Sequence, residues 1–254
     1  MTSPKLSAIY RYPVKGLSPQ RLERVALEAG KTLPFDRAWA IENGPGRFDE
    51  QAPKYLPKIS FLMLMRNERL ATLESEFDEE AQTLTIRRAG RQVARGQLDT
   101  TLGRRMLEQF FAAYMKDSLR GAPHIVSAPG HSFSDVAAKC VHIVNLATVA
   151  EVERAAGREV DPLRFRANLY LDRVPAWAEF KWIGKTIRIG AVSFKVFDRT
   201  TRCDATNVDP KTGARDMAIP ATLQRRWSHS DFGVYANVVT DGEIADGDEV
   251  VAAE

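Results

Sequence analysis

The stretch WIGKTIRIGAVSFKVFDRTTRC, residues 182–203, is the clearest indication of how this chain folds. Apolar and polar residues alternate on both sides of Gly190, with many β-branched and aromatic side chains, a pattern typical of half-buried strands. The second run ends in threonines and arginines. We therefore predict two consecutive strands broken at Gly190, the second of which leads to Cys203.

The strand pattern recurs along the rest of the chain. Residues 83–98 predict a hairpin that turns at Ala89–Gly90, and residues 232–251 predict a hairpin-rich end with Asp-Gly turns. Further strands are expected in three apolar runs, at residues 6–14, 37–43 and 59–65, the last of which is typical of a buried strand.

A helical period replaces the strand pattern in residues 99–115. Asp99 or Thr100 stands where an N-cap belongs, and apolar side chains follow at every fourth position. We expect an amphipathic helix that packs this stripe into the core. The stripe consists of Leu102, Met106, Phe110 and Tyr114.

A second helix is predicted after a strand at residues 141–144. Asn145 is a natural cap for this helix and Gly157 ends it. A helix N-terminus offers unpaired N–H groups, so Asn145 and Thr148 would stand where an anion can bind. Taken alone, this segment favours simple capping.

Turn residues and element types define the expected fold class. Glycines and prolines punctuate the segment after residue 118, where we place a boundary between a β-rich N-terminal domain, 1–118, and a second domain, 119–254. Strands predominate and helices are few. We predict an α+β fold that is predominantly β, with a β-barrel-like part and a smaller N-terminal α+β region.

Composition excludes several function classes. The 254 residues include 36 basic and 33 acidic ones, a net charge of +3, and no basic stripe interleaved with aromatic residues predicts nucleic-acid binding. We find neither a signal-like start nor an apolar run long enough to span a bilayer, so we expect a cytoplasmic protein without a membrane partner. Its two cysteines form no CxxC motif, which predicts reduced thiols.

Residues 164–172, RFRANLYLD, alternate between apolar and polar side chains. On a strand, Arg166 and Asn168 would point the same way. Such a pair can hold a phosphate or a carbonyl-rich ligand, because arginine offers a fork of donors and asparagine offers a donor and an acceptor. A solvated outer face is the ordinary alternative.

Three interpretations of Cys203 are open on chemical grounds. An inert, buried thiol suits Cys140 beside its apolar strand better than it suits Cys203, which lies between Arg202 and Asp204. A nucleophile paired with a histidine lacks a recognisable local signature. A thiolate ligand to a metal would need further ligands from a cofactor, and a phosphate-bearing cofactor would explain the nearby arginines.

An ordered series of motifs decides among these interpretations. RFRAN, W.G..IRIG, RC..T.VDP.TG.RD, FGVYANV and G.I..GD.V follow one another, after IYRYPVKGLSP and LPFDRAWAIEN near the start. The series resembles the MOSC-domain proteins of molybdenum-cofactor metabolism, especially the mitochondrial amidoxime-reducing component and its bacterial homologues. The resemblance covers nearly the whole chain.

This resemblance implies a MOSC-type β-barrel that binds a molybdenum cofactor, Mo-molybdopterin, with the thiolate of Cys203 as the protein's metal ligand. It also implies that Asp204 tunes the site or relays protons, although a turn-stabilising contact explains Asp204 equally well. The residues it assigns to cofactor binding are Lys15, Arg37, Asn145, Thr148, Arg166, Asn168, Thr201, Arg202, Cys203 and Tyr235.

The sequence departs from the better-known members at several points. Gly16 and Asn145 stand where those members often carry serines, which removes hydroxyl contacts. The cysteines of an appended ferredoxin domain, found in some bacterial relatives, are missing, so we expect a separate electron donor. A ferredoxin, a flavodoxin or a cytochrome b5-like protein with its reductase would fill this role.

The activity implied by the resemblance is a molybdenum-dependent oxidoreductase, in which Cys203 and Asp204 serve catalysis. Its substrates would be N-hydroxylated compounds, namely amidoximes, hydroxylamines and N-hydroxylated base analogues, which are reduced to amidines or amines. One alternative is a non-catalytic carrier of the molybdenum cofactor or of sulfur on Cys203. Another is a β-barrel binding module without a metal.

Overall fold

The computed structural model describes residues 3–44 and 46–252, and its main element is an eight-stranded sheet. Neighbouring strands are antiparallel throughout, except that β9 and β10 run parallel. The strands, in spatial order, are β15 (Val250–Ala252), β11 (Thr186–Ile189), β12 (Val192–Thr201), β13 (Asp231–Val238), β9 (Val141–Asn145), β10 (Leu169–Asp172), β1 (Lys5–Arg11) and β2 (Gln20–Leu22).

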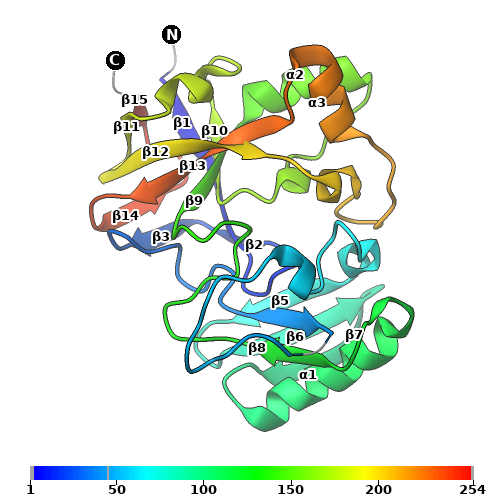
Figure 1. The fold of residues 1–254 in the computed structure, drawn as a ribbon. Helices are drawn as coiled ribbons and strands as arrows, with labels where there is room; N and C mark the ends of the chain where they lie inside the picture. Colours follow the sequence, from blue (N-terminus) through cyan, green and yellow to red (C-terminus); the bar gives the residue numbers. More distant parts are fainter. Residues whose placement is uncertain (1–2, 45, 253–254) are drawn as a thin grey trace.

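This sheet curls until the edge strand β15 approaches β1. The backbone N–H of Leu6 in β1 donates to Asp248 O at 2.8 Å, and Val250 N in β15 donates to Pro4 O at 2.9 Å. Figure 1 shows β1, β11 and β15 together at one end of the molecule. The inward side chains, among them Ile9, Ile143 and Phe194, form a buried apolar core. The predicted β-rich, barrel-like class is therefore confirmed.

A smaller unit lies below the large sheet in Figure 1 and has its own apolar core. It contains a three-stranded sheet against which one helix packs. Its elements are β5 (Glu74–Asp78), β6 (Thr83–Arg88), β7 (Arg91–Gln97) and α1 (Thr101–Tyr114), beside the pair β4 (Ala40–Asn43) and β8 (Pro123–Val126).

The two ends of the chain interleave. Strand β3 (Arg24–Leu27) pairs with β14 (Gly242–Ala245), and β1 pairs with β10, so the first thirty residues join strands from the second half. Two helices, α2 (Leu146–Ala156) and α3 (Ile219–Trp227), pack against each other. The short 3-10 helices are η1 (Lys58–Ser60), η2 (Glu68–Thr72), η3 (Lys116–Ser118), η4 (Pro162–Phe165), η5 (Ala178–Trp182) and η6 (Asp204–Asn207).

Several local predictions are confirmed. β6 and β7 form the hairpin that turns at Ala89–Gly90, both residues having positive φ, and β11 and β12 meet at Gly190. Helix α2 is capped by Asn145, whose Oδ1 accepts from Ala147 N at 3.0 Å, and ends at Gly157 in the left-handed conformation. No helix within the described ranges is long and apolar enough to cross a membrane.

Helix α1 exists where it was predicted, but only half of its predicted apolar stripe packs against the core. Thr100 is the cap, accepting from Gly103 N at 3.1 Å. Phe110 and Tyr114 are partly buried against the core as expected. Leu102 and Met106 are 70% and 52% exposed, whereas Leu107 is fully buried. The reason is a close approach: a Cβ on Gly103 would lie 2.2 Å from Gln97 O in β7, so only glycine can face the sheet there.

Two strand predictions are also wrong. Residues 59–65 contain part of η1 and a turn instead of a strand, although Leu62 and its neighbours are buried as expected. The C-terminal strands form no hairpin with each other, because β14 pairs with β3 and β15 pairs with β11. Partners distant in sequence thus replace the local ones.

The close contact between α1 and β7 predicts how a substitution at Gly103 changes the stability of the protein. In an ordinary helix Gly→Ala stabilises by about 1 kcal/mol. Gly103→Ala should instead lower the free energy of unfolding by about 1–3 kcal/mol, because the added methyl overlaps the backbone of β7. Urea denaturation measures the change. Met106→Ala on the exposed face should alter stability by no more than about 0.5 kcal/mol; a stabilised Gly103→Ala would contradict the packing described.

Candidate functional site

A cavity of about 320 Å³ lies beside the end of β12. Chain segments from both halves of the sequence form its wall. Basic side chains outnumber acidic ones, so the cavity favours an anion. The basic residues are Lys15, Arg37, Lys58, Arg164, Arg166, Arg199 and Arg202, and the acidic residues are Asp36, Asp135 and Asp198.

Most residues that the sequence resemblance assigned to the site lie on this wall. Those brought together are Lys15, Arg37, Arg166, Asn168, Thr201, Arg202, Cys203 and Tyr235. Thr201 lies in β12 and Tyr235 in β13, and the others lie in irregular segments between the named elements. Three others, Asn145, Thr148 and Asp204, are placed elsewhere, as described below.

The ring of Tyr12 packs against the guanidinium groups of two of the arginines. The guanidinium carbon of Arg37 lies 4.4 Å from the centre of the Tyr12 ring, and that of Arg166 lies 4.2 Å from it. Arg37 also donates to Asp36 Oδ2 at 2.5 Å and to the backbone carbonyl of Arg166 at 2.8 Å. A shared aromatic ring and one carboxylate therefore stabilise two like charges.

Both of these arginines have left-handed backbones, each with a φ of 50°. Non-glycine residues in this region cost of order 1 kcal/mol or more and persist where the surrounding structure fixes them. Arg166 follows η4 and precedes β10, so the strand predicted for residues 164–172 begins only at Leu169. Arg166 and Asn168 thus reach the same cavity without sharing a strand.

Two guanidinium groups on the wall lack a carboxylate partner among the described residues. Arg166 stacks on Tyr12, and burial together with the charge of Arg37 lowers the pKa of Arg166 to about 10. Arg202 donates from Nη2 to Phe165 O at 2.7 Å, while its Nε is buried without a partner among those residues. Such charges are costly to bury unless an anion joins them.

Two more residues on the same wall have a buried polar atom without a hydrogen-bond partner in the described part of the chain. Thr200 Oγ1 and Arg164 Nε are buried, and no described residue bonds to either. Together with Arg202 Nε, these atoms can satisfy an oxygen-rich, anionic group such as a phosphate. The donor set therefore fits the phosphate-bearing cofactor that the resemblance implies.

A carboxylate shared by two lysines forms another part of the wall. Lys15 Nζ donates to Asp135 Oδ1 at 2.5 Å, and Lys58 Nζ lies 3.4 Å from Asp135 Oδ2. Burial lowers the pKa of Lys15. Although burial opposes ionisation of Asp135, the charges of Lys15 and Lys58 hold its pKa below the usual value. The carboxylate thus stays ionised.

Cys203 is half-buried and follows the end of β12. Its carbonyl accepts from Thr206 N at 3.1 Å and from Thr206 Oγ1 at 2.9 Å, which fixes the backbone at the cysteine. Among the described residues no three His, Cys, Asp or Glu side chains are arranged to hold a metal ion. A metal bound to this sulfur would therefore bring other ligands with it.

The second cysteine, Cys140, also lies on the cavity wall. It was expected to be an inert thiol packed beside a strand, and it is 6% exposed. Burial raises the pKa of Cys140 to about 12, so it stays protonated near neutral pH. The half-buried Cys203 is the better placed of the two to bind a metal.

Three predicted site residues do not line the cavity. Asn145 and Thr148 are fully buried and donate to Glu179, at 2.9 Å to Oε2 and 2.7 Å to Oε1. Burial raises the pKa of this carboxyl group. Asp204 is exposed and accepts from Asn207 Nδ2 at 3.2 Å within η6, the turn-stabilising contact that was the alternative. We therefore leave all three out of the proposed cofactor site.

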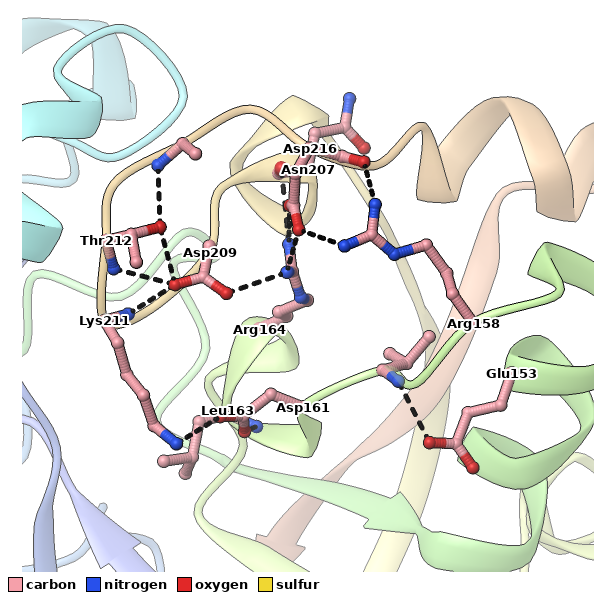
Figure 2. Close-up of polar contacts among 12 residues, drawn as sticks. Glu153, Arg158, Asp161, Leu163, Arg164, Asn207, Asp209, Lys211, Thr212 and Asp216 are labelled. Carbon is pink, nitrogen blue, oxygen red and sulfur yellow. Dashed lines mark hydrogen bonds and ion pairs between the residues drawn. The ribbon is translucent and has the colours of Figure 1, made fainter.

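Arg164 anchors the loop that follows Cys203. Figure 2 shows its guanidinium between Asp209 and Asp216, with Arg158 approaching Asp216 from the other side. Arg164 Nη2 lies 3.1 Å from Asp209 Oδ2, and Nη1 lies 2.9 Å from Asp216 Oδ1. Asp209 also accepts from the backbone of Lys211 and Thr212, closing the VDPKTG turn.

Sequence reasoning missed several wall residues, notably Lys58, Asp135 and Arg164. Lys58 and Asp135 lie in segments with no strand or helix period, so no pattern marked their direction. Arg164 stands two positions before Arg166 in the RFRAN motif, and its cluster with Asp209 depends on pairing across the fold. The basic residues near Cys203 were the only available signal.

Two family profiles match this chain. The profile of the MOSC N-terminal beta barrel domain matches residues 3–119, and that of the MOSC domain matches residues 128–251.

Curated relatives carry the name molybdenum cofactor sulfurase. That of Drosophila ananassae is 26% identical over 98% of this chain and 34% of its own length, and that of Homo sapiens is 21% identical over 89% and 29%. The chain thus spans about a third of the length of these relatives.

Solved structures are more distant. The YUAD protein of Bacillus subtilis is 12% identical, with a TM-score of 0.47 over 100% of this chain and 97% of that one. YiiM of Geobacillus stearothermophilus is 17% identical, with a TM-score of 0.36 over 45% and 54%.

The Arg164 cluster predicts an asymmetric effect on stability. Arg164→Met should lower the free energy of unfolding by about 3–5 kcal/mol, because Asp209 and Asp216 lose a nearly buried partner. Arg158→Met removes a more exposed arginine from the same Asp216 and should cost no more than about 1 kcal/mol. Guanidinium denaturation compares the two variants, and equal losses would show that Arg164 is no anchor.

Proposed function

The chain belongs to the family of MOSC-domain proteins, and on that premise we propose that it binds a molybdenum cofactor and reduces N-hydroxylated compounds with it. Amidoximes, hydroxylamines and N-hydroxylated base analogues are the proposed substrates, and amidines or amines are the products. The observation that carries this proposal is a cavity in which Cys203 stands beside guanidinium groups that lack carboxylate partners among the described residues.

The proposed roles follow from the positions of the side chains. Arg166, Arg202 and Lys15 would hold the anionic part of the cofactor, and the sulfur of Cys203 would bind its metal. The ring of Tyr12 contacts the guanidinium groups of both Arg166 and Arg37. Asn168 is oriented by its own bonds, donating to Tyr10 O at 3.1 Å and accepting from His142 N at 3.1 Å.

When bound, the cofactor would supply the two-electron redox chemistry. Cleavage of the N–O bond consumes two electrons and two protons and releases water. We propose that the electrons come from a separate donor protein, a ferredoxin, a flavodoxin or a cytochrome b5-like protein. The proposed location is the cytoplasm, and residues 1–118 and 119–254 are the proposed domains.

A second candidate function is supported by the curated relatives, whose name is molybdenum cofactor sulfurase. A carrier would bind the cofactor, or sulfur on Cys203, and transfer it to other enzymes without reducing a substrate. The same cavity and cysteine would serve both functions. Turnover therefore discriminates between them better than binding does.

Protein purified from a host that makes the cofactor tests the proposal. We expect molybdenum in the wild type by elemental analysis, together with reduction of benzamidoxime by chemically reduced protein. Cys203→Ala should lose both, because the metal loses its protein ligand. Cys140→Ala, which removes a protonated thiol, should retain both.

The two measurements can fail separately, and each negative result leads to a different conclusion. Protein with molybdenum but without benzamidoxime reduction would favour the carrier. A wild type without molybdenum, or a Cys203→Ala variant with unchanged metal and turnover, would refute the proposed site.

A further inference from the structure

Lys58 lies on the cavity wall but differs from the deeper cations. Its side chain is 31% exposed, against 8% for Lys15 and 3% for Arg164. It is the first residue of η1 in the N-terminal half of the chain, and its Nζ contacts Asp135 on the cavity wall. A ligand that enters the cavity from solvent can therefore meet this ammonium group.

The charge on Lys58 is only partly neutralised. Asp135 is its one carboxylate partner among the described residues, and Lys15 occupies the other oxygen of that carboxylate at the shorter distance, 2.5 Å against 3.4 Å. Two ammonium groups that share one carboxylate leave a net positive charge. Tyr55 OH donates to the backbone carbonyl of Asp135 at 3.0 Å and helps to fix this arrangement.

Lys58 lines the same cavity as Cys203, and so does Asp135, the carboxylate that Lys58 contacts. A ligand that approaches Cys203 therefore approaches a partly exposed positive charge as well. Arg166 and Arg202 remain available for the cofactor.

We propose that Lys58 is a specificity-determining residue that selects N-hydroxylated substrates bearing a negatively charged substituent. This inference rests on the proposed function and names its substrate class. An ammonium group acts as a point charge, so it accepts a carboxylate or a phosphate alike and discriminates against neutral analogues. Its partial exposure makes the preference sensitive to ionic strength.

Alkylation of cofactor-free, full-length protein tests the charge preference without any turnover. Iodoacetate and iodoacetamide react with the same thiolate, so the ratio of their rate constants at Cys203 does not depend on how far the thiol ionises. Mass spectrometry of the Cys203 peptide gives both rates. Lys58→Met should lower the iodoacetate-to-iodoacetamide ratio about threefold or more at low salt, since one partly screened charge is removed. Lys54→Met, an exposed lysine in the same segment, should leave the ratio unchanged.

The KM values of the enzyme with its cofactor bound give a second test. Benzamidoxime and its 4-carboxylate and 4-phosphonate derivatives are compared as substrates. The wild type should show the lower KM for both anionic derivatives, and Lys58→Met should raise KM for these about threefold or more while benzamidoxime is unaffected.

The outcomes separate the two proposals. If no substrate is reduced, the proposed function fails, and the alkylation ratio still decides whether Lys58 selects anions. An alkylation ratio that is the same in wild type and Lys58→Met overturns the inference, as does an equal change in KM for charged and neutral substrates. A preference for only one of the two anionic derivatives would refute selection by a point charge.

Discussion

The positive charge gathered around Cys203 is the constraint on which the site depends. Seven basic and three acidic side chains line one cavity, and the guanidinium groups of Arg166 and Arg202 have no carboxylate partner among the described residues. The fold stabilises the excess locally: Tyr12 lies under Arg37 and Arg166, and Asp135 joins two lysines. The guanidinium groups that remain without a carboxylate favour an anionic ligand rich in oxygen acceptors.

The fold supplies the rigidity that such an arrangement needs. Cys203 follows a ten-residue strand in the middle of the large sheet, and Arg164 fastens the loop beyond it. Arg37 and Arg166 come from irregular segments with left-handed backbones, where flanking elements fix the conformation. The interleaving of the first thirty residues with the C-terminal strands brings Lys15 to the same cavity as Cys203. Strain and unpaired charge thus coincide at the candidate site, as they do at many functional sites.

How much could be predicted from the sequence depended on the range of the interactions. The strands around Gly190 and the cap at Asn145 follow from short-range geometry and were found at the predicted places. The buried face of α1 depends on the approach of Gly103 to another strand, which no helical period reveals. Family resemblance identified eight residues of the cavity wall. It did not identify Lys58 and Asp135, which lie in segments without a pattern, and it assigned to the site Asn145 and Thr148, which bond to Glu179, a partner distant in sequence.

We propose that Arg166 and its neighbours form a receptor for an anion. The Tm of cofactor-free protein, titrated with phosphate against chloride at matched ionic strength, tests this most directly. Phosphate should raise the Tm of the wild type, since a ligand at a hundred times its Kd stabilises by about 2.7 kcal/mol, and Arg166→Gln should lose most of this rise. No rise in the wild type, or the same rise in Arg166→Gln, would contradict the account.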